Sequence, residues 1–371
     1  MELLLLLLVL SVAFFNGAND ISKGVATLSG SGLCTTQSAL RWGAFWTAAG
    51  GLTALLIASA LLKVFSDGIL SADLPITIHF SIAVAAGITG WVFLATRVGM
   101  PVSTTHSIVG ALCGPVVMAL DPSKVLWFSL GHKVLLPLLF SPLIALLLTL
   151  LLYRGGYRLF ARLSRYCFCL ERKGELCYNE SSESALVFSN KSVDTAVEVG
   201  TIERCGENLH EPIRVNVNDA AHWLSSGLIS FARGLNDTPK IVAIMFVSAT
   251  FVASEVTVIT LLAVLAMALG GYWKGIKVTE TLSRKVTGMD RNDSVIANLV
   301  TALLVVVASR YGVPVSTTHV SSSSIIGIGL RRDGGGIKRR VLYEMLLAWI
   351  VTLPVAGIIS GLVYIVFSSL A

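Results

Sequence analysis

Long apolar runs separated by short polar segments make up most of the chain. Six of the runs are long enough to cross a membrane, since about 20 apolar residues span roughly 30 Å of hydrocarbon. They are 2–28, 38–63, 125–152, 219–247, 254–271 and 341–368. Two further pairs of apolar arms, 78–97 with 101–120 and 293–310 with 313–330, each meet at a Gly/Pro break. This pattern predicts an all-α integral membrane protein with discontinuous helices or re-entrant hairpins.

An internal repeat divides the chain into two halves. Gly-Ala-Asn-Asp at 17–20 recurs as Gly-Leu-Asn-Asp at 234–237, and Pro-Val-Ser-Thr-Thr-His at 101–106 recurs at 314–319. The two motifs keep their order and nearly their spacing, with offsets of 217 and 213 residues. We therefore expect a first membrane repeat over 1–152, a polar insert over 153–218 and a second membrane repeat over 219–371. The Ser- and Glu-rich insert is typical of a flexible segment.

The composition excludes a soluble protein. Hydrophobic residues make up 54% of the chain and charged residues only 13%, whereas soluble domains carry about 25% charged residues. The net charge of +6 does not indicate nucleic-acid binding, because the basic residues stand in short clusters beside apolar runs. The six cysteines lack the paired spacing of a zinc site, so no metal is expected in the insert.

The distribution of Lys and Arg predicts the orientation in the membrane. Sixteen basic residues lie in 153–176, 271–293 and 331–340, and only Lys124 lies in 64–77 and 121–124. This places the insert in the cytoplasm and both termini outside. The first repeat then begins outside and the second inside, so the two repeats are inverted. Inverted repeats with discontinuous helices are typical of secondary transporters, which bind substrate near the midplane.

The Asn-Asp-x-x-Lys motif lies near the middle of the first span of each repeat. A carboxylate in hydrocarbon costs several kcal/mol unless it is paired or hydrated, so Asp20 and Asp237 are functional candidates. The alternative is a structural ion pair with Lys23 and Lys240, three residues further along the helix. Duplication in an inverted repeat favours a central site, because both copies then meet there.

The Pro-Val-Ser-Thr-Thr-His motif begins the second arm of each pair. Pro suits the first helical turn and Ser or Thr suits the cap, so the motif predicts a helix N-terminus with free N–H groups beside hydroxyls. Such a terminus binds oxyanions. The candidate ligands are Ser103, Thr104, Thr105, Ser316, Thr317 and Thr318. The alternative is plain helix capping, with the hydroxyls bonded to backbone.

Oxygen-bearing side chains beside this anion site could bind a coupling cation. Asn19 and Asn236 adjoin the two aspartates and complete a candidate site for this cation. An aspartate could instead accept a proton. His106 and His319 titrate near neutral pH and could carry a proton, although packing and capping are their other role. Lys23 and Lys240 are accessory candidates.

At these doubled motifs the chain resembles the inorganic phosphate transporter (PiT) family, over roughly 1–150 and 218–370. The resemblance implies a phosphate symporter of the cell membrane, driven by sodium or protons, with no cofactor and no enzymatic activity. It assigns the six hydroxyl residues to phosphate, and the Asn-Asp pairs to sodium and phosphate. Many members have Asn rather than Lys at the position of Lys23, so this chain departs from the family there.

Three alternatives stay open beside a phosphate symporter that works by alternating access. The same fold could carry sulfate or another oxyanion, and the same ligands could line a passive anion channel. An intramembrane hydrolase with Ser, His and Asp would need one asymmetric site, whereas every candidate here is duplicated. The expected partners are phosphate, the coupling cation and the lipid bilayer, with no nucleic acid. A second copy of the chain, in a homo-oligomer, is a further candidate partner.

Overall fold

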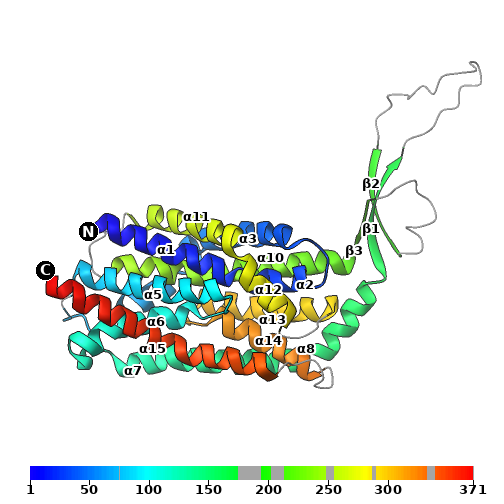
Figure 1. Cartoon of the computed structure of the whole chain (residues 1–371). Helices are drawn as coiled ribbons and strands as arrows, with labels where there is room; N and C mark the ends of the chain where they lie inside the picture. Colours follow the sequence, from blue (N-terminus) through cyan, green and yellow to red (C-terminus); the bar gives the residue numbers. More distant parts are fainter. Residues whose placement is uncertain are drawn as a thin grey trace, which may run out of the picture.

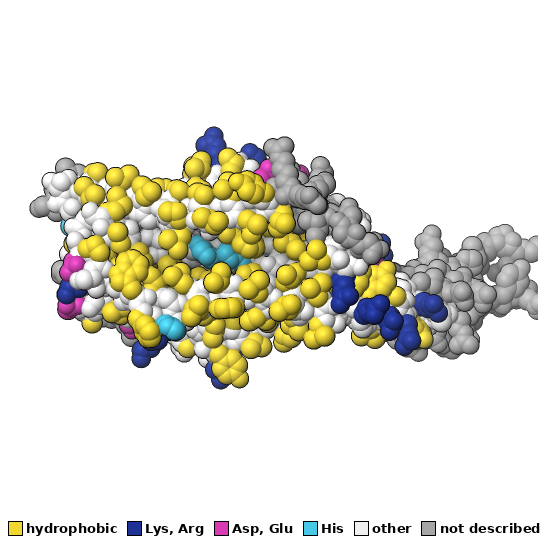
Figure 2. Space-filling model, turned by 90° about the horizontal axis from the view of Figure 1, so that it is seen from below, with side chains coloured by type: hydrophobic (Ala, Val, Ile, Leu, Met, Phe, Trp, Pro, Cys, Tyr) yellow, Lys and Arg dark blue, Asp and Glu magenta, His cyan; other side chains and the backbone are white. Residues whose placement is uncertain are grey.

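Long helices lie side by side in one bundle, and a small β-sheet stands at one end of it (Figure 1). The structure is a computed structural model that describes residues 1–74, 76–173, 194–201, 213–247, 255–285, 290–331 and 339–370. Hydrophobic side chains cover the face seen in Figure 2, as expected of a surface in contact with lipid. At the sheet end of this face, basic side chains gather, and exposed Arg154, Arg158, Arg162 and Arg165 lie on or just after α8 (Leu136–Leu163).

The first half folds into broken helices, as the Gly/Pro pattern predicts. Its elements are α1 (Glu2–Asp20), α2 (Ser22–Gly30), α3 (Thr36–Ile57), α4 (Ser59–Asp67), α5 (Ile78–Val98), α6 (Thr104–Ala119), η1 (Pro122–Lys124), α7 (Trp127–Ser129), the π-helix η2 (Leu130–Leu135) and α8. The predicted span 2–28 is two helices that meet at Ile21. The predicted span 38–63 bends by 78° between α3 and α4.

The second half follows the same plan. Its helices are α10 (Val217–Phe246), α11 (Val256–Lys274), α12 (Ile276–Lys285), α13 (Arg291–Arg310), α14 (Thr317–Arg331) and α15 (Arg339–Leu370). Six helices of the described residues are long and apolar enough to span a membrane, or seven if the bent pair α3–α4 counts as one span. The 30-residue α10 is not among them, although at 1.5 Å per residue it is about 45 Å long. Its charged residues lower its hydropathy, and it packs against α3 and α13.

The insert contains regular secondary structure that its composition does not indicate. Helix α8 continues to Leu163, past the predicted boundary at 152. Three antiparallel strands follow in the order β2-β1-β3, namely β1 (Tyr166–Lys173), β2 (Asp194–Thr201) and β3 (Ile213–Asn216). The polar composition hid these short strands, whose pairing partners lie far apart in the sequence. The remaining parts of the insert, 174–193 and 202–212, lie outside the described residues.

The two halves begin at opposite ends of the bundle. Helix α1 starts at the end where both chain termini lie, whereas α10 starts directly after β3, at the end that carries the sheet (Figure 1). Helices α1 and α10, which carry the two copies of the Asn-Asp motif, therefore run in opposite directions. The termini and the insert lie at opposite ends, which is the relative placement that the distribution of Lys and Arg requires.

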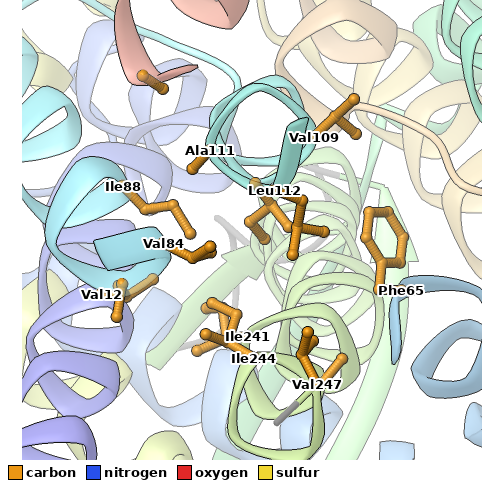
Figure 3. Close-up of a cluster of buried hydrophobic side chains, with 14 of the residues drawn as sticks. Val12, Phe65, Val84, Ile88, Val109, Ala111, Leu112, Ile241, Ile244 and Val247 are labelled. Atoms are coloured by element: carbon orange, nitrogen blue, oxygen red, sulfur yellow. The ribbon is translucent and has the colours of Figure 1, made fainter. Parts of the chain in front are cut away.

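The helices of the two halves interlock instead of forming two separate bundles. Helix α1 packs along α11, α3 packs along α10, and α6 packs along α15, so each contact joins one half to the other. Figure 3 shows the resulting core, in which apolar side chains of α1, α4, α5 and α6 meet those of α10. The candidate site lies where these helices cross.

Candidate functional site

Two glycines with equivalent positions in the repeat let the site helices approach closely. A Cβ atom added at Gly17 would lie 1.9 Å from the carbonyl oxygen of Met267 in α11, and one at Gly234 would lie 2.1 Å from that of Thr47 in α3. Real Cβ atoms never come so close to backbone oxygens. The glycine of each Gly-x-Asn-Asp motif therefore holds the following Asn and Asp against a helix of the other half.

Two further glycines form the breaks that precede the Pro-Val-Ser-Thr-Thr-His segments at 101–106 and 314–319, called the hydroxyl motifs below. Gly99 and Gly312, which are also equivalent, end α5 and α13 in the left-handed conformation, with φ of 75° and 68°. Non-glycine residues rarely adopt this conformation. After each break the chain runs extended for a few residues and then enters α6 or α14. Both hydroxyl motifs thereby become helix N-termini in the interior of the bundle.

In the first half, the Asn-Asp-x-x-Lys motif binds the extended link before α6. The ammonium group of Lys23 forms an ion pair with Asp20 and also donates to the carbonyl oxygen of Val102 at 3.4 Å. Asn19 accepts from the Val102 N–H at 3.1 Å and donates to the Met100 carbonyl at 2.9 Å. The predicted structural ion pair is thus present in this half, inside the candidate site.

In the second half, the equivalent residues bind the equivalent link before α14, but the lysine reaches further. The Lys240 Nζ atom donates to the Val315 carbonyl at 2.8 Å and to Thr105 Oγ1 at 2.9 Å, and it lies 3.8 Å from Asp237. Asn236 donates to the Val315 carbonyl at 3.2 Å and to Asp237 at 2.9 Å. Lys240 therefore joins the two halves, whereas Lys23 stays with its own carboxylate.

A matched pair of hydrogen bonds ties the two hydroxyl motifs together. Thr105 donates to the carbonyl of Val315 at 3.4 Å, and its equivalent Thr318 donates to the carbonyl of Val102 at 2.9 Å. Each half thus offers the other the same donor and the same acceptor. This reciprocity indicates that the two motifs meet across an approximate two-fold axis.

The serines of the hydroxyl motifs cap their helices. Ser103 accepts the N–H of His106 at 3.3 Å, and Ser316 accepts the N–H of His319 at the same distance. Capping was the alternative role for these residues, and the structure shows it for both serines. The hydroxyl proton of Ser316 is not used in this cap, so Ser316 can donate it to a bound ligand. Thr104 likewise accepts from a side-chain amide and keeps its proton, and Thr317 lies buried at the equivalent position.

The two motif histidines touch each other one turn into their helices. The ring centroids of His106 and His319 are 4.5 Å apart, and His319 stacks on Trp349 of α15 at 3.9 Å. His106 Nδ1 lies 2.8 Å from Ser103 Oγ. The packing and capping contacts of the two histidines agree with the structural role named above.

Sequence reasoning missed two residues of this site, Asn16 and Arg233. They occupy equivalent positions, 217 residues apart and one residue before each motif glycine. Asn16 Nδ2 lies 3.3 Å from Asp20, 3.2 Å from Asp237 and 2.9 Å from Thr104 Oγ1, so it bridges both carboxylates. Arg233 donates to the Asn16 carbonyl at 3.4 Å and, through Nη2 at 2.8 Å, to Thr47. A buried arginine in a predicted span was the available signal.

Five charged side chains are buried together in this centre. They are Asp20, Lys23, Arg233, Asp237 and Lys240, each no more than 4% exposed. Three cationic groups therefore face two carboxylates. In a low-dielectric interior such charges interact strongly, and an unbalanced one is expensive. With all five groups charged, the centre has a surplus of one positive charge, which favours the binding of an anion.

A protein-family match covers nearly the whole chain. The model of the phosphate transporter family matches residues 16–360. The chain belongs to the phosphate transporter family. The family resemblance seen in the doubled motifs is thereby confirmed, and the chain is a transporter and not an enzyme, which removes the intramembrane hydrolase.

Individual relatives of the phosphate transporter family match along nearly the whole chain. A putative phosphate permease of Pyrococcus horikoshii is 27% identical over 98% of this chain and 96% of its own length. A probable low-affinity inorganic phosphate transporter of Mycobacterium tuberculosis H37Rv is 25% identical over 98% of this chain and 78% of its own length. A solved structure titled "The sodium-dependent phosphate transporter" aligns with a TM-score of 0.76 at 23% identity, covering 100% and 99% of the two chains. It supports the same fold.

Proposed function

We propose that the chain imports inorganic phosphate together with a cation, sodium or the proton, by alternating access. The observation that carries the proposal is the meeting of two hydroxyl-bearing helix N-termini beside a buried centre with surplus positive charge. Helix N-termini supply N–H donors and a positive dipole end, which bind phosphate oxygens without a fixed counter-charge. Discontinuous helices at the midplane provide such termini in secondary transporters.

The phosphate ligands in this proposal come from both hydroxyl motifs. Thr104 and Ser316 keep hydroxyl protons that a phosphate oxygen can accept. Thr105 and Thr318 use theirs on the carbonyls of the opposite half. These two threonines are therefore the groups that must exchange a backbone partner for phosphate when the site opens. Asp20 and Asp237 accept a proton or bind the cation together with Asn19 and Asn236.

Movement in this proposal pivots at the two broken helices. Gly99 and Gly312 absorb backbone rotation at equivalent places, and each directly precedes a hydroxyl motif. A symmetric exchange of contacts between the halves then gives an outward-open and an inward-open state of similar energy. We further propose that the sheet end, with its basic side chains, faces the cytoplasm and that both termini face outward, in a two-repeat cell-membrane protein joined by a cytoplasmic insert.

The test is uptake of radiolabelled phosphate into proteoliposomes that hold the purified full-length protein. Uptake is measured with a sodium gradient alone, with a proton gradient alone and with neither. Concentrative uptake driven by one of the gradients is the expected result. Equilibration of phosphate without any cation gradient would instead identify a passive channel.

The substrate is tested in the same vesicles by competition. Excess unlabelled phosphate is expected to abolish the signal, and excess sulfate is expected to leave most of it. Near neutral pH phosphate carries a proton that it can donate to Asp20 or Asp237, whereas sulfate has none. Stronger competition by sulfate than by phosphate would reassign the chain to sulfate.

A further inference from the structure

The candidate cation ligands of both halves already hold a cation that belongs to the chain. In the second half, Lys240 Nζ lies within hydrogen-bonding distance of the Thr105 hydroxyl and the Val315 carbonyl and lies 3.8 Å from the Asp237 carboxylate. The ammonium group thus donates hydrogen bonds to the hydroxyl and the carbonyl and forms an ion pair with the carboxylate. Carboxylate and unwound backbone carbonyl oxygens are the ligands that coordinate sodium in secondary transporters.

The first half repeats this arrangement with its own lysine. Lys23 Nζ pairs with the Asp20 carboxylate and donates to the Val102 carbonyl. Val102 and Val315 are equivalent residues, and each lies in the link just before a helix, α6 or α14. The same kind of site is therefore filled twice, by lysines at equivalent positions. One such lysine could be a local structural feature, but two related by the repeat indicate a function of the site itself.

The asparagines that would complete a sodium site are also engaged with protein groups. The Asn19 side-chain oxygen accepts the N–H of Val102 at 3.1 Å. The Asn236 side-chain oxygen accepts from Ser309 at 3.3 Å. A sodium ion would have to share these oxygens with their N–H and O–H donors, and it would have to displace the lysine ammonium groups. The residues present therefore do not fit sodium in this arrangement.

The charge of the centre leads to the same result by a separate route. Lys23, Lys240 and Arg233 outnumber Asp20 and Asp237 by one positive charge, and all five groups are buried. Adding sodium would double this surplus in a low-dielectric interior, whereas adding a phosphate monoanion would cancel it. The charge that a bound sodium would supply next to phosphate is already supplied by the chain.

We propose that the ammonium groups of Lys23 and Lys240 act as built-in cations in the two cation sites, so that phosphate binding and uptake do not need sodium. The inference rests on the proposed transport of phosphate and narrows its coupling ion, since the proton is then the remaining candidate. The ammonium groups are tethered three residues from their aspartates and stay in the protein while phosphate passes.

The experiment compares phosphate binding in sodium with binding in a bulky organic cation. The full-length protein in lipid nanodiscs binds radiolabelled phosphate in sodium chloride or in N-methyl-glucamine chloride of equal concentration. For the unaltered protein we expect the same Kd in both salts, within about twofold. Tighter binding in sodium by about tenfold or more, which lies in the usual range for two coupled ligands, would overturn the inference and leave the proposed function standing. Absence of phosphate binding in both salts would overturn both.

A paired variant turns the same experiment into a gain of sodium dependence. Lys23→Asn together with Lys240→Asn removes both tethered charges and opens the two oxygen sets. Phosphate binding by this variant is expected to fall about tenfold or more in N-methyl-glucamine and to recover in sodium. Equal weakening in both salts would overturn the inference. Lys63→Asn, which removes an exposed lysine of α4, is the matched control and is expected to bind as the unaltered chain does.

A direct measurement covers the case in which the double variant does not fold. Binding of radiolabelled sodium to the unaltered protein is followed with and without saturating phosphate. Because coupling between two ligands is reciprocal, sodium-independent phosphate binding requires that phosphate does not raise sodium binding. Phosphate-dependent binding of about one sodium per chain would overturn the inference.

Discussion

The two halves carry the same motifs but use them differently. In the first half Asp20 forms an ion pair with its own Lys23, and the residue four positions before Asp20 is the neutral Asn16. In the second half Asp237 lies 3.8 Å from Lys240, which donates its hydrogen bonds to Val315 and to Thr105 of the opposite half. The residue four positions before Asp237 is the charged Arg233.

This difference teaches that a duplicated motif does not imply two identical half-sites. In the proposed alternating-access cycle, every open state is asymmetric, because one gate is open while the other is closed. If the halves exchange roles, Lys23 should reach across to Thr318 while Lys240 closes onto Asp237. The asymmetry at Asn16 and Arg233, in contrast, is written in the sequence and persists in both states.

Removing either carboxylate is expected to have the largest effect. Asp20→Asn and Asp237→Asn each leave a buried cation without its partner, which costs about 3–5 kcal/mol. Both should abolish phosphate uptake in proteoliposomes, and Asp20→Asn should lower Tm more, because its ion pair is the closer one. Asp20→Asn with Lys23→Gln should recover much of the Tm and none of the uptake. Normal uptake by either single variant would remove its aspartate from the site.

The built-in asymmetry is tested by making the second half resemble the first. Arg233→Asn places the residue of position 16 at its equivalent and removes the surplus positive charge. A charge-assisted hydrogen bond contributes about 1.5–3 kcal/mol, so phosphate binding should weaken by about tenfold or more. Arg233→Lys keeps the charge and should lose less. Arg291→Asn, which removes a partly exposed pair with Asp219, is the control. Unchanged phosphate affinity in Arg233→Asn would show that the charge of Arg233 does not contribute to phosphate binding.

Substitution of the two motif glycines, Gly17 and Gly234, should lower Tm to a similar extent. Gly17→Ala and Gly234→Ala push a methyl group into a backbone carbonyl, at 1.9 and 2.1 Å before relaxation. Overpacking of this kind costs about 1–3 kcal/mol, which is measurable as a lower Tm in detergent. Gly155→Ala, with nothing within 4 Å of the added carbon, should not lower Tm, because Ala favours the helix more than Gly does. A large loss of Tm at only one of the two motif glycines would mean that the two close helix contacts are not equivalent.

The smallest effect is expected at an exposed pair of the same residue types. Hydrogen bonds from Lys124 and Ser71 lower the pKa of Asp73 to about 2. Because this pKa lies below the ordinary value of 3.8, the pair's contribution is complete above pH 4 and is lost as the pH falls toward 2. Lys124→Gln should therefore change neither uptake nor Tm appreciably between pH 5 and 7, since exposed pairs contribute little. A loss of uptake comparable to that of Asp20→Asn would contradict this reading.

The sequence allowed the fold class and the positions of the motifs to be predicted, because both depend on local signals. Runs of apolar residues mark helices, and Pro101 and Pro314 mark the breaks that precede the hydroxyl motifs. The bend between α3 and α4 and the strands of the insert could not be predicted, since they depend on contacts distant in sequence.

The candidate site was predictable only in part, for a related reason. Asp20 and Asp237 stand out because carboxylates in apolar runs are expensive. Arg233 could have been found by the same rule. Asn16 could not, because a neutral amide in a span gives no such signal. The reach of Lys240 to Thr105 depends on the crossing of the two halves, which no spacing within one helix encodes.

The interlocking of the halves also sets a schedule for synthesis. Helix α1 finds its lasting neighbour in α11, which begins 236 residues after α1 ends. At about 5–20 residues per second, α1 waits roughly 10–50 s in the membrane before that partner is made. During this interval Gly17 lacks its contact with Met267, and Asp20 and Lys23 can pair only with groups of the first half, above all with each other. We therefore expect their close ion pair to lower the cost of keeping these two charged side chains in lipid until the second half is synthesised.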